Sequence, residues 1–393
     1  MNRAGPHRLK RITGLLLLPL ARKALADERA DLTCWDCDVI KGTPIPPGRM
    51  VCRITGRAAS RGRAVRWSVF LRVPEPSMEH RDPIRREAFH RELMLYRSGV
   101  LDELPSGIAA PRLLGVTEHP GDEPWTWFED VAAEDSIGWP LERFALAARH
   151  FGRLNGVFLG SATLAACPQL DRSEWFGKGV RRTFGQVSTV FEAFRTHPLT
   201  SRLWDADLGR QVRDLWGSRE IFVQALDRMP RTLCHGDLCM PNLMSRRLDD
   251  GTDETVLIDW QYGGWSQIGP DIAGLIADSS LIPARRKVGE PEEFAEMMLD
   301  AYLSGLRDSG QGQSVPFARF GCLATLAYPW GLYVLMRLND KVLQREPNAE
   351  NRNQLEDALG QYVRAQHFVL RVAKQARKTL PDVLPGLCGT RGT

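Results

Sequence analysis

Three oxygen-bearing side chains in the middle of the chain stand where phosphoryl transfer would need them. Asp237 and Asn242 lie five residues apart in the segment LCHGDLCMPN, and Asp259 follows the apolar run 256–258. Phosphoryl transfer asks little covalent chemistry of a protein: it needs a carboxylate near the attacking hydroxyl and oxygen ligands for magnesium. Asp237 can face an acceptor hydroxyl while Asn242 turns toward a metal. Asp259, at a strand end, can meet a nucleotide phosphate.

Each of these residues also has an ordinary structural interpretation. The HGD turn at 235–237 can be a satisfied loop, and an aspartate after a strand is often only a cap. Their combination in one ordered set is what favours chemistry.

Two regions of different class must position these side chains. Alternating β-branched and aromatic stretches dominate from about 39 to 131, and helical periodicities dominate afterwards. Strands are expected near 38–42, 51–55, 65–73, 111–116 and 125–129, with a turn at 56–62 and a helix over 83–98. Helices are expected near 141–161, 172–195 and 204–228 and again toward 379, with a hairpin-like turn at 249–253.

The segment HGDLCMPN at 235–242, followed by LIDW at 257–260, resembles the aminoglycoside phosphotransferase and choline kinase-like family, relatives of protein kinases. The later segment WSQIGPDIAG at 265–274 resembles the family segment whose aspartate, here Asp271, braces the catalytic loop. The resemblance implies an α+β, two-lobed protein-kinase-like fold, with a five-stranded antiparallel sheet plus a helix in the N-lobe and a mainly helical C-lobe. The expected division is an N-terminal helical extension over 1–36, an N-lobe over 37–131 and a C-lobe over 132–393.

The resemblance also implies a role for each matching residue. Asp237 is expected to be the catalytic base or the group that positions the hydroxyl, and His235 a structural member of the loop. Asn242 and Asp259 are expected to bind Mg²⁺, and Asp271 to brace the loop. ATP or GTP is the expected phosphate donor, and a hydroxylated small molecule the acceptor.

The strand 65–73 departs from the family pattern. Kinases carry a lysine on the third strand that grips the α- and β-phosphates and is held by a glutamate from the next helix. Here Arg72 occupies that position, and only eight of the 52 basic residues are lysines. Arginine keeps the charge and can donate two parallel hydrogen bonds to phosphate, although its planar fork reaches differently. The expected partner is Glu92, beside the apolar face of the helix over 83–98.

The rest of the expected nucleotide site rests on two segments. Gly42 and Gly48 are candidates for the loop that covers the phosphates, but the three prolines between them remove backbone donors. Glu129 to Val131 is the expected hinge, which the resemblance predicts to meet adenine or guanine through backbone groups.

Composition excludes several other classes. The formal net charge is only +4 and the basic residues are spread along the chain, so we expect neither a nucleic-acid nor a membrane partner. Eight scattered cysteines do not form a disulfide framework and favour a cytoplasmic location. The apolar run 12–20 precedes a sequence that mimics a signal-peptidase site, but Arg22 and Lys23 interrupt it. We expect an amphipathic helix that packs on the first lobe.

The acceptor stays open, and an antibiotic or other natural product is one option. A cationic acceptor would need acidic side chains, and an uncharged ring would suit an aromatic wall. The acidic candidates are Glu134, Asp135, Asp278, Glu290, Glu292 and Glu293, and the aromatic ones are Tyr328, Trp330 and Tyr333. Two alternatives are a peptide serine/threonine kinase of modified-peptide biosynthesis and a catalytically silent kinase-like binding protein.

Overall fold

The computed structural model describes residues 9–40, 49–74, 83–119, 122–131, 134–172, 187–200, 206–282 and 290–388. The chain divides into two compact units. The first comprises Met1–Asp102, Ala109–Ala133 and Val256–Gln261, and the second Glu103–Ile108, Glu134–Thr255 and Tyr262–Thr393. The segment that carries Asp259 was expected in the helical lobe, but it groups with the first unit.

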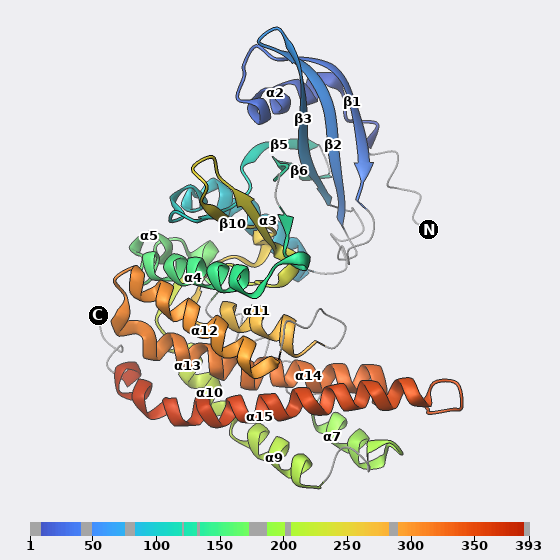
Figure 1. Cartoon of the computed structure of the whole chain (residues 1–393), viewed down its shortest axis with the longest axis vertical. Helices are drawn as coiled ribbons and strands as arrows, with labels where there is room; N and C mark the ends of the chain where they lie inside the picture. Colours follow the sequence, from blue (N-terminus) through green and yellow to red (C-terminus); the bar gives the residue numbers. More distant parts are fainter. Residues whose placement is uncertain are drawn as a thin grey trace. The chain divides into compact units, whose positions relative to one another are not determined.

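The first unit is built on a five-stranded antiparallel sheet in the order β1-β2-β3-β6-β5. This confirms the predicted five strands, and α3 (Pro83–Arg97) matches the predicted helix. The strands are β1 (Asp31–Val39), β2 (Arg49–Ser60), β3 (Arg63–Pro74), β5 (Leu113–His119) and β6 (Asp122–Glu129). Figure 1 shows β1, β2 and β3 side by side with α2 (Gly14–Leu25) against them.

Two predicted boundaries in this sheet are wrong. The first strand begins at Asp31, not near residue 38, so a boundary at residue 36 falls inside β1. The turn expected over 56–62 is much shorter, because β2 and β3 pair from Arg49 to Ser60 and reverse at Arg61 and Gly62. Both turn residues have positive φ, +49° and +74°, as in a two-residue hairpin turn. Gly56 serves packing instead, since a Cβ there would lie 2.7 Å from the Trp67 ring.

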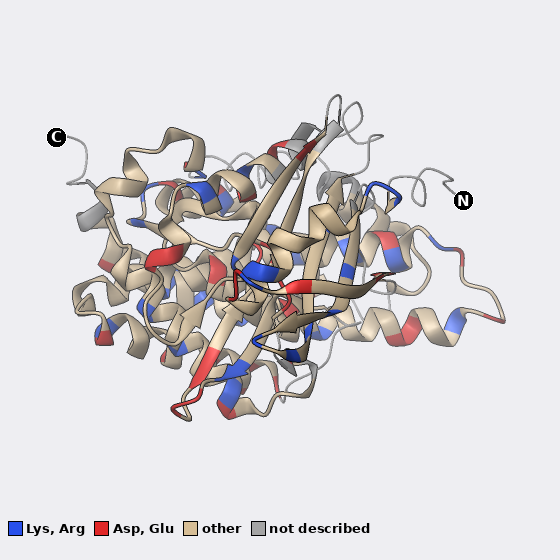
Figure 2. Ribbon diagram, turned by 90° about the horizontal axis from the view of Figure 1, so that it is seen from above, with Lys and Arg blue, Asp and Glu red and all other residues tan. Residues whose placement is uncertain are grey.

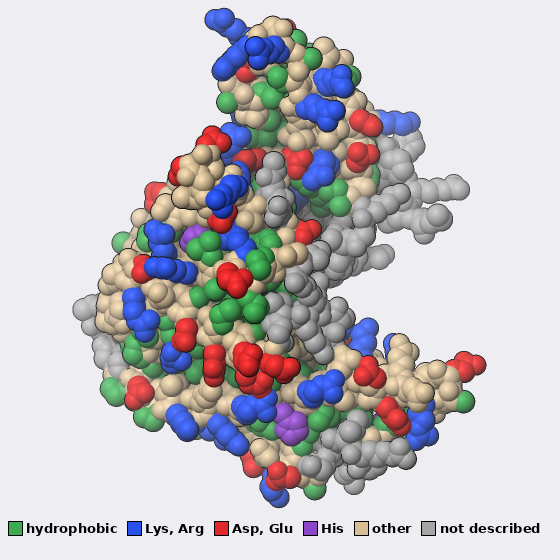
Figure 3. All heavy atoms as spheres, viewed as in Figure 1, with side chains coloured by type: hydrophobic (Ala, Val, Ile, Leu, Met, Phe, Trp, Pro, Cys, Tyr) green, Lys and Arg blue, Asp and Glu red, His purple; other side chains and the backbone are tan. Residues whose placement is uncertain are grey.

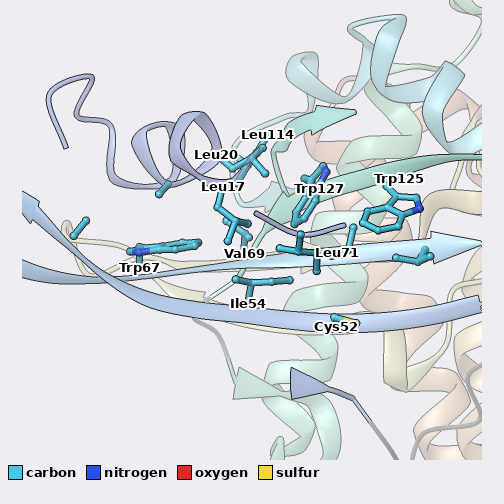
Figure 4. Packing of buried hydrophobic residues seen from close by; sticks show 14 of the residues in the cluster. Leu17, Leu20, Cys52, Ile54, Trp67, Val69, Leu71, Leu114, Trp125 and Trp127 are labelled. Carbon is cyan, nitrogen blue, oxygen red and sulfur yellow. The ribbon is translucent and has the colours of Figure 1, made fainter. Parts of the chain in front are cut away.

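The core of the first unit lies between α2 and the sheet. Buried and less buried residues alternate along β3, and this alternation places Trp67, Val69 and Leu71 on the face toward α2. Leu17 and Leu20 of α2 meet them there (Figure 4). The predicted helix that packs on the first lobe is thus confirmed. Phe70 and Arg72 alternate with these residues and lie on the opposite face of the strand.

The second unit is mainly helical. Figure 1 shows α15 running beside α13 and α14, with α9 against its other side, and these pairs are in contact. The principal helices are α4 (Leu141–Val157), α7 (Val187–Thr196), α9 (Ala206–Gly217), α10 (Arg219–Asp227), α11 (Pro270–Ser280), α12 (Pro291–Asp308), α13 (Val315–Thr325), α14 (Gly331–Leu338) and α15 (Arg352–Cys388).

The helical predictions hold with two differences. The helix expected over 204–228 is two helices, α9 and α10, separated at Ser218. Of the helix expected over 172–195, the described part begins at Val187, and 173–186 lie outside the described residues. Between α13 and α14 the chain forms a π-helix, η8 (Leu326–Trp330), which contains Pro329.

Two small sheets contain the strands next to the loop 235–242 and to Asp259. One has the order β4-β10-β9-β7 and the other pairs β11 with β8. Their strands are β4 (Ile108–Ala109), β7 (Glu134–Asp135), β8 (Arg231–Cys234), β9 (Leu243–Arg247), β10 (Asp253–Leu257) and β11 (Gly264–Gln267). The turn predicted at 249–253 joins β9 to β10, and is confirmed.

Charge of both signs is spread over much of the described part of the chain. Acidic and basic residues are interspersed along the ribbon in Figure 2, and the surface in Figure 3 shows basic residues in many places and one group of acidic side chains in its lower half. Within the described ranges, every helix is either too short or too polar to cross a membrane.

Candidate active site

The loop that follows β8 carries the predicted residues His235, Asp237 and Asn242, and a fourth, Asp271, bonds to it. His235 is completely buried, and its ring Nδ1 lies 3.4 Å from the Asp237 backbone N–H. Gly236 has φ +78°, and a Cβ there would stand 2.2 Å from the Tyr262 carbonyl oxygen. Only glycine fits both this conformation and this close approach. The turn therefore fixes the direction in which Asp237 leaves the strand.

Asp237 and Asn242 are held together at the two ends of this loop. The Asn242 side-chain amide donates to the Asp237 carbonyl at 2.8 Å and to its carboxylate at 3.3 Å. A short 3-10 helix, η5 (Met240–Asn242), brings the chain round between them. Since the amide NH₂ group faces Asp237, the amide oxygen of Asn242 is the atom left to face a metal.

Asp271 braces the loop from α11, as the sequence predicted. Its carboxylate accepts the backbone N–H groups of His235 at 2.6 Å and of Gly236 at 2.9 Å. Burial raises the pKa of Asp271 to about 6, against the opposing effect of these two hydrogen bonds. Its place in the first turn of α11 also favours a negative charge.

A second carboxylate on α11 holds the far end of the loop, and the sequence interpretation missed it. Asp278 is 3 % exposed and accepts the Met240 backbone N–H at 3.1 Å. The Met240 carbonyl in turn accepts the Ser136 hydroxyl at 2.6 Å. Asp271 and Asp278 are two turns apart on one face of α11, and a Cβ on Gly274 between them would lie 3.0 Å from the Leu238 carbonyl. This spacing was visible in the sequence, but Asp278 was interpreted there as part of an acidic pocket.

Three further predicted residues, Arg72, Glu92 and Asp259, form one charged cluster in the first unit. The Arg72 guanidinium lies 2.5 Å from the Glu92 carboxylate and 3.3 Å from the Asp259 carboxylate. Glu92 also accepts the Trp260 backbone N–H at 3.0 Å, and this ties α3 to the segment after β10. The predicted Arg72–Glu92 ion pair is therefore present.

Burial and charge act in opposite directions on Arg72. Burial alone would lower the pKa of its guanidinium, but the charges of Glu92 and Asp259 outweigh that and raise the pKa. Arg72 is thus a permanent cation in a site that excludes much of the water, where its field is strong. Its guanidinium also lies 5.2 Å from the centre of the Phe128 ring.

Asp259 has an unusual backbone conformation. Its φ is +67°, one of three positive values at non-glycine residues in the described chain. Aspartate tolerates this left-handed region better than most residues, and such positions concentrate at functional sites. Gln261 donates to the Asp259 carboxylate at 3.3 Å.

The donor chemistry of Asn242 and Asp259 suits a hard divalent cation, since an amide oxygen and a carboxylate are ligands that Mg²⁺ accepts. No group of three or more His, Cys, Asp or Glu in the described residues is arranged to hold a metal.

The predicted nucleotide segments are only partly described. Gly42 and Gly48 lie outside the described residues. Glu129 donates its backbone N–H to the Arg112 carbonyl at 2.9 Å. This N–H group is therefore used in the contact between the end of β6 and the residue before β5. The Glu129 carboxylate is 3.1 Å from the Arg112 guanidinium, and Val131 is buried.

The acceptor candidates separate into inward and outward groups. Asp278 faces the loop, and Glu292 pairs with Arg371 of α15, whereas Asp135, Glu290 and Glu293 are exposed. Nothing is described for the Glu134 side chain.

The aromatic candidates divide in the same way. Tyr328 is buried and stacks on Phe222 at 4.4 Å. Trp330 and Tyr333 meet edge to face at 5.3 Å, and Tyr333 is 39 % exposed.

The fold is the one predicted for a kinase-like phosphotransferase. Its five-stranded sheet carries Arg72, which pairs with Glu92 of a helix, and its mainly helical unit carries the Asp237 loop, to which Asp271 is hydrogen-bonded. The sequence model of the phosphotransferase enzyme family (APH) matches residues 51–313, which include every predicted catalytic, nucleotide-binding and metal-binding residue that the structure describes. The chain belongs to this family.

Solved structures of similar proteins include three kinases at low identity. An ethanolamine kinase of Plasmodium vivax is 12 % identical with a TM-score of 0.48, over 86 % of this chain and 83 % of that one. An aminoglycoside phosphotransferase of Alicyclobacillus acidocaldarius is 13 % identical with a TM-score of 0.48, over 87 % and 93 %. An amicoumacin kinase, solved with AMP-PNP, Ca²⁺ and amicoumacin, is 13 % identical with a TM-score of 0.46, over 92 % and 96 %. No curated protein matches the sequence significantly.

Proposed function

We propose that this protein transfers the γ-phosphate of ATP or GTP to a hydroxyl group of a small molecule, with Mg²⁺ as the metal. The observation that carries the proposal is the loop in which Asn242 is bonded to Asp237 while Asp271 holds the turn between His235 and Gly236. A loop fixed at this many points keeps a carboxylate in one place, as a positioned catalytic group requires.

Asp237 orients the acceptor hydroxyl and accepts its proton. In a loose transition state the proton leaves late, so orientation contributes more than abstraction. A positioned acid–base group typically contributes roughly a hundred- to ten-thousand-fold in rate.

Asn242 and Asp259 would hold the magnesium ion, with an amide oxygen and a carboxylate as the ligands they can offer. When bound, the ion neutralises charge on the phosphates of the donor nucleotide. Arg72 supplies the cation that grips the α- and β-phosphates, and Glu92 keeps its guanidinium in place.

The acceptor is a hydroxylated natural product or antibiotic, modified inside the cell. Of the acidic residues considered for a cationic acceptor, Asp278 is committed to the Met240 N–H. The edge-to-face pair of the half-buried Trp330 and the exposed Tyr333 offers a surface for a ring. This aromatic pair supports an acceptor that carries an apolar or sugar ring.

Nucleotide consumption with Mg²⁺ tests the proposal. The panel should contain aminoglycosides, nucleoside antibiotics, choline, sugars and a serine- and threonine-bearing peptide. The variant Asp237→Ala is compared with Asp249→Ala, which removes an exposed aspartate from the turn between β9 and β10.

Acceptor-dependent turnover that Asp237→Ala loses and Asp249→Ala keeps supports the proposal and identifies the acceptor class. Turnover with the peptide alone would instead make the protein a peptide kinase. Nucleotide binding without turnover on any acceptor would make it a catalytically silent binding protein.

A further inference from the structure

A groove lies on the first unit over β1, β2 and β3, and its volume is about 550 Å³. Its lining contains two rows of residues that cross these strands. One row is Cys34, Arg57 and Arg66, and the other is Asp36, Thr55 and Ser68. Paired residues share a face of a sheet, as do alternate residues of a strand, so all of these side chains lie opposite the face on which Figure 4 shows Trp67. The groove therefore opens on the side of the sheet away from α2.

The groove is separate from the cation proposed to contact the nucleotide phosphates. Arg66 precedes Arg72 by six residues on β3. Six residues of extended strand span about 20 Å. The volume of the groove also falls within the range of roughly 300–1,000 Å³ that small-molecule sites occupy. The groove thus has the size and the position of a second ligand site.

Two arginines face each other in the groove without a counter-charge. Arg57 and Arg66 are directly paired on β2 and β3, and both are exposed. Like charges that stand opposite each other on a sheet destabilise it. Cys34 occupies the position opposite Arg57 on β1, and the Asp36 carboxylate accepts the Cys37 backbone N–H at 2.8 Å. Among the described residues, neither guanidinium forms an ion pair with a carboxylate.

Two hydroxyl groups lie beside the arginines. Thr55 and Ser68 are paired in the next row of the same two strands, and both are half-buried. Neither hydroxyl has a hydrogen-bond partner in the described part of the chain. Paired Cβ atoms lie about 5 Å apart, and the next row on the same face lies about 7 Å away. The four side chains therefore surround one small area with hydrogen-bond donors.

We propose that this groove binds a phosphate or sulfate group, with the guanidinium groups of Arg57 and Arg66 and the hydroxyl groups of Thr55 and Ser68 as donors. Charge-assisted hydrogen bonds of about 2.7–2.9 Å would join a tetrahedral oxyanion to both rows. The anion would also remove the repulsion between the two arginines. Asp36, in the second row, repels a further negative charge, so the groove suits one anionic group rather than a polyphosphate.

The same chemistry fits a free ion and an ester. The groove is much larger than one phosphate ion, so it has room for a small molecule that carries the group.

Calorimetric titrations of the full chain, in a buffer free of phosphate and sulfate, test this proposal. The probes are inorganic phosphate, sulfate and glycerol 3-phosphate, with acetate as a planar anion for comparison. The tetrahedral anions should bind more tightly than acetate. Tighter binding of glycerol 3-phosphate than of phosphate would identify an ester as the ligand, and the reverse order would identify the free ion. Both results support the proposal.

Variants locate the bound anion. Arg66→Ala should weaken anion binding about tenfold, and Ser68→Ala about threefold, because each removes hydrogen bonds to the anion. Arg63→Ala is the matched control, since Arg63 is an exposed arginine on the same strand that alternates onto the other face. It should bind the anions like wild type. Arg72→Ala should also retain binding.

Thermal unfolding supplies a second arm. Without an anion, Arg66→Ala should unfold at no lower a temperature than wild type, because the repulsion between the paired arginines is gone. Added phosphate should raise the unfolding midpoint of wild type and of Arg63→Ala more than that of Arg66→Ala, since a ligand stabilises the state that binds it.

Wild type that binds none of the three tetrahedral anions would overturn the proposal. An equal loss of affinity in Arg63→Ala and Arg66→Ala would overturn it as well, because binding would then follow the overall surface charge. Loss of binding in Arg72→Ala, with binding retained in Arg66→Ala, would place the anion at the proposed catalytic site and contradict a separate site in the groove.

Discussion

Arg72 and Glu92 form a buried ion pair, with Nη1 and Oε2 2.5 Å apart, although one residue lies on β3 and the other on α3. Arginine thus stands in the contact that the family resemblance predicted for lysine. The same guanidinium reaches Asp259 at 3.3 Å, so the larger planar group bridges two carboxylates at once.

Replacement of Arg72 should separate charge from geometry. Arg72→Ala removes a cation proposed to contact the phosphates, and kcat/KM should fall by about a hundredfold or more. Arg72→Lys keeps the charge but loses the planar guanidinium, so its kcat/KM should lie between those of wild type and Arg72→Ala. Steady-state kinetics with varied ATP measure this. Arg66→Ala, an exposed arginine on the same face of β3, should behave like wild type, and an equal loss in Arg66→Ala would contradict the assignment.

Asp278 should affect the use of metal through Asn242. Asp278→Leu leaves the buried Met240 N–H without its carboxylate, at a cost of about 1–3 kcal/mol in the free energy of unfolding. Because Met240 begins the 3-10 turn that carries Asn242, the Mg²⁺ concentration for half-maximal activity should rise.

Two controls accompany this prediction. Asp278→Asn keeps an acceptor for the Met240 N–H and should restore most of the metal response. Ser279→Ala removes the neighbouring buried hydroxyl, which donates to the Leu275 carbonyl within α11. A loss of stability in Asp278→Leu with an unchanged Mg²⁺ response would mean a purely structural role.

Asp271 predicts a pH dependence of stability. Its pKa in the folded protein, about 6, is above the unfolded value of 3.8. Between these values the folded state binds more protons, so raising the pH across this window lowers stability. Relative to Asp271→Asn, which does not titrate, wild type should lose about 3 kcal/mol in total as the pH rises from about 3 to about 7, with about 2 kcal/mol of this between pH 4 and pH 6. Urea unfolding of both proteins at each pH measures the difference, and a constant difference would show that Asp271 has an ordinary pKa.

The packing of α2 predicts a contrast between two leucines on one helix. Leu17 is completely buried and Leu15 is 88 % exposed. Leu17→Ala should reduce the free energy of unfolding by about 2–5 kcal/mol, because it opens a cavity in the core of the first unit. Leu15→Ala has the same helix propensity change and should stay close to wild type. Comparable unfolding midpoints for the two variants would contradict the placement of α2 against the sheet.

The sequence analysis placed site residues that are near each other in sequence more successfully than residues that only the fold brings together. Asp237 and Asn242 belong to one loop, and Glu92 could be placed from the apolar face of its own helix. Asp278 could not be placed, because only the fold brings α11 against Met240. The value of its two-turn spacing from Asp271 appears once the loop is known to lie along that face.

The sheet shows a similar division. β3 carries a clear alternation and β6 a continuous buried run with two tryptophans, whereas β1 is an edge strand with mostly exposed residues, so its first half gave no apolar pattern. Gly56 suggested a turn, but it is in the strand because Trp67 packs against its bare Cα. A glycine needed for close packing and a glycine needed for a turn look the same in a single sequence.

The central claim is most directly tested by following phosphorus in the reaction mixture. ³¹P NMR of ATP, Mg²⁺ and the accepted substrate should show the γ-phosphate signal replaced by a phosphomonoester when wild type is added, and ADP formed in equal amount. Asp237→Ala should leave the ATP signals unchanged over the same time. A phosphomonoester formed at the wild-type rate by Asp237→Ala, or inorganic phosphate as the sole product of wild type, would contradict the account.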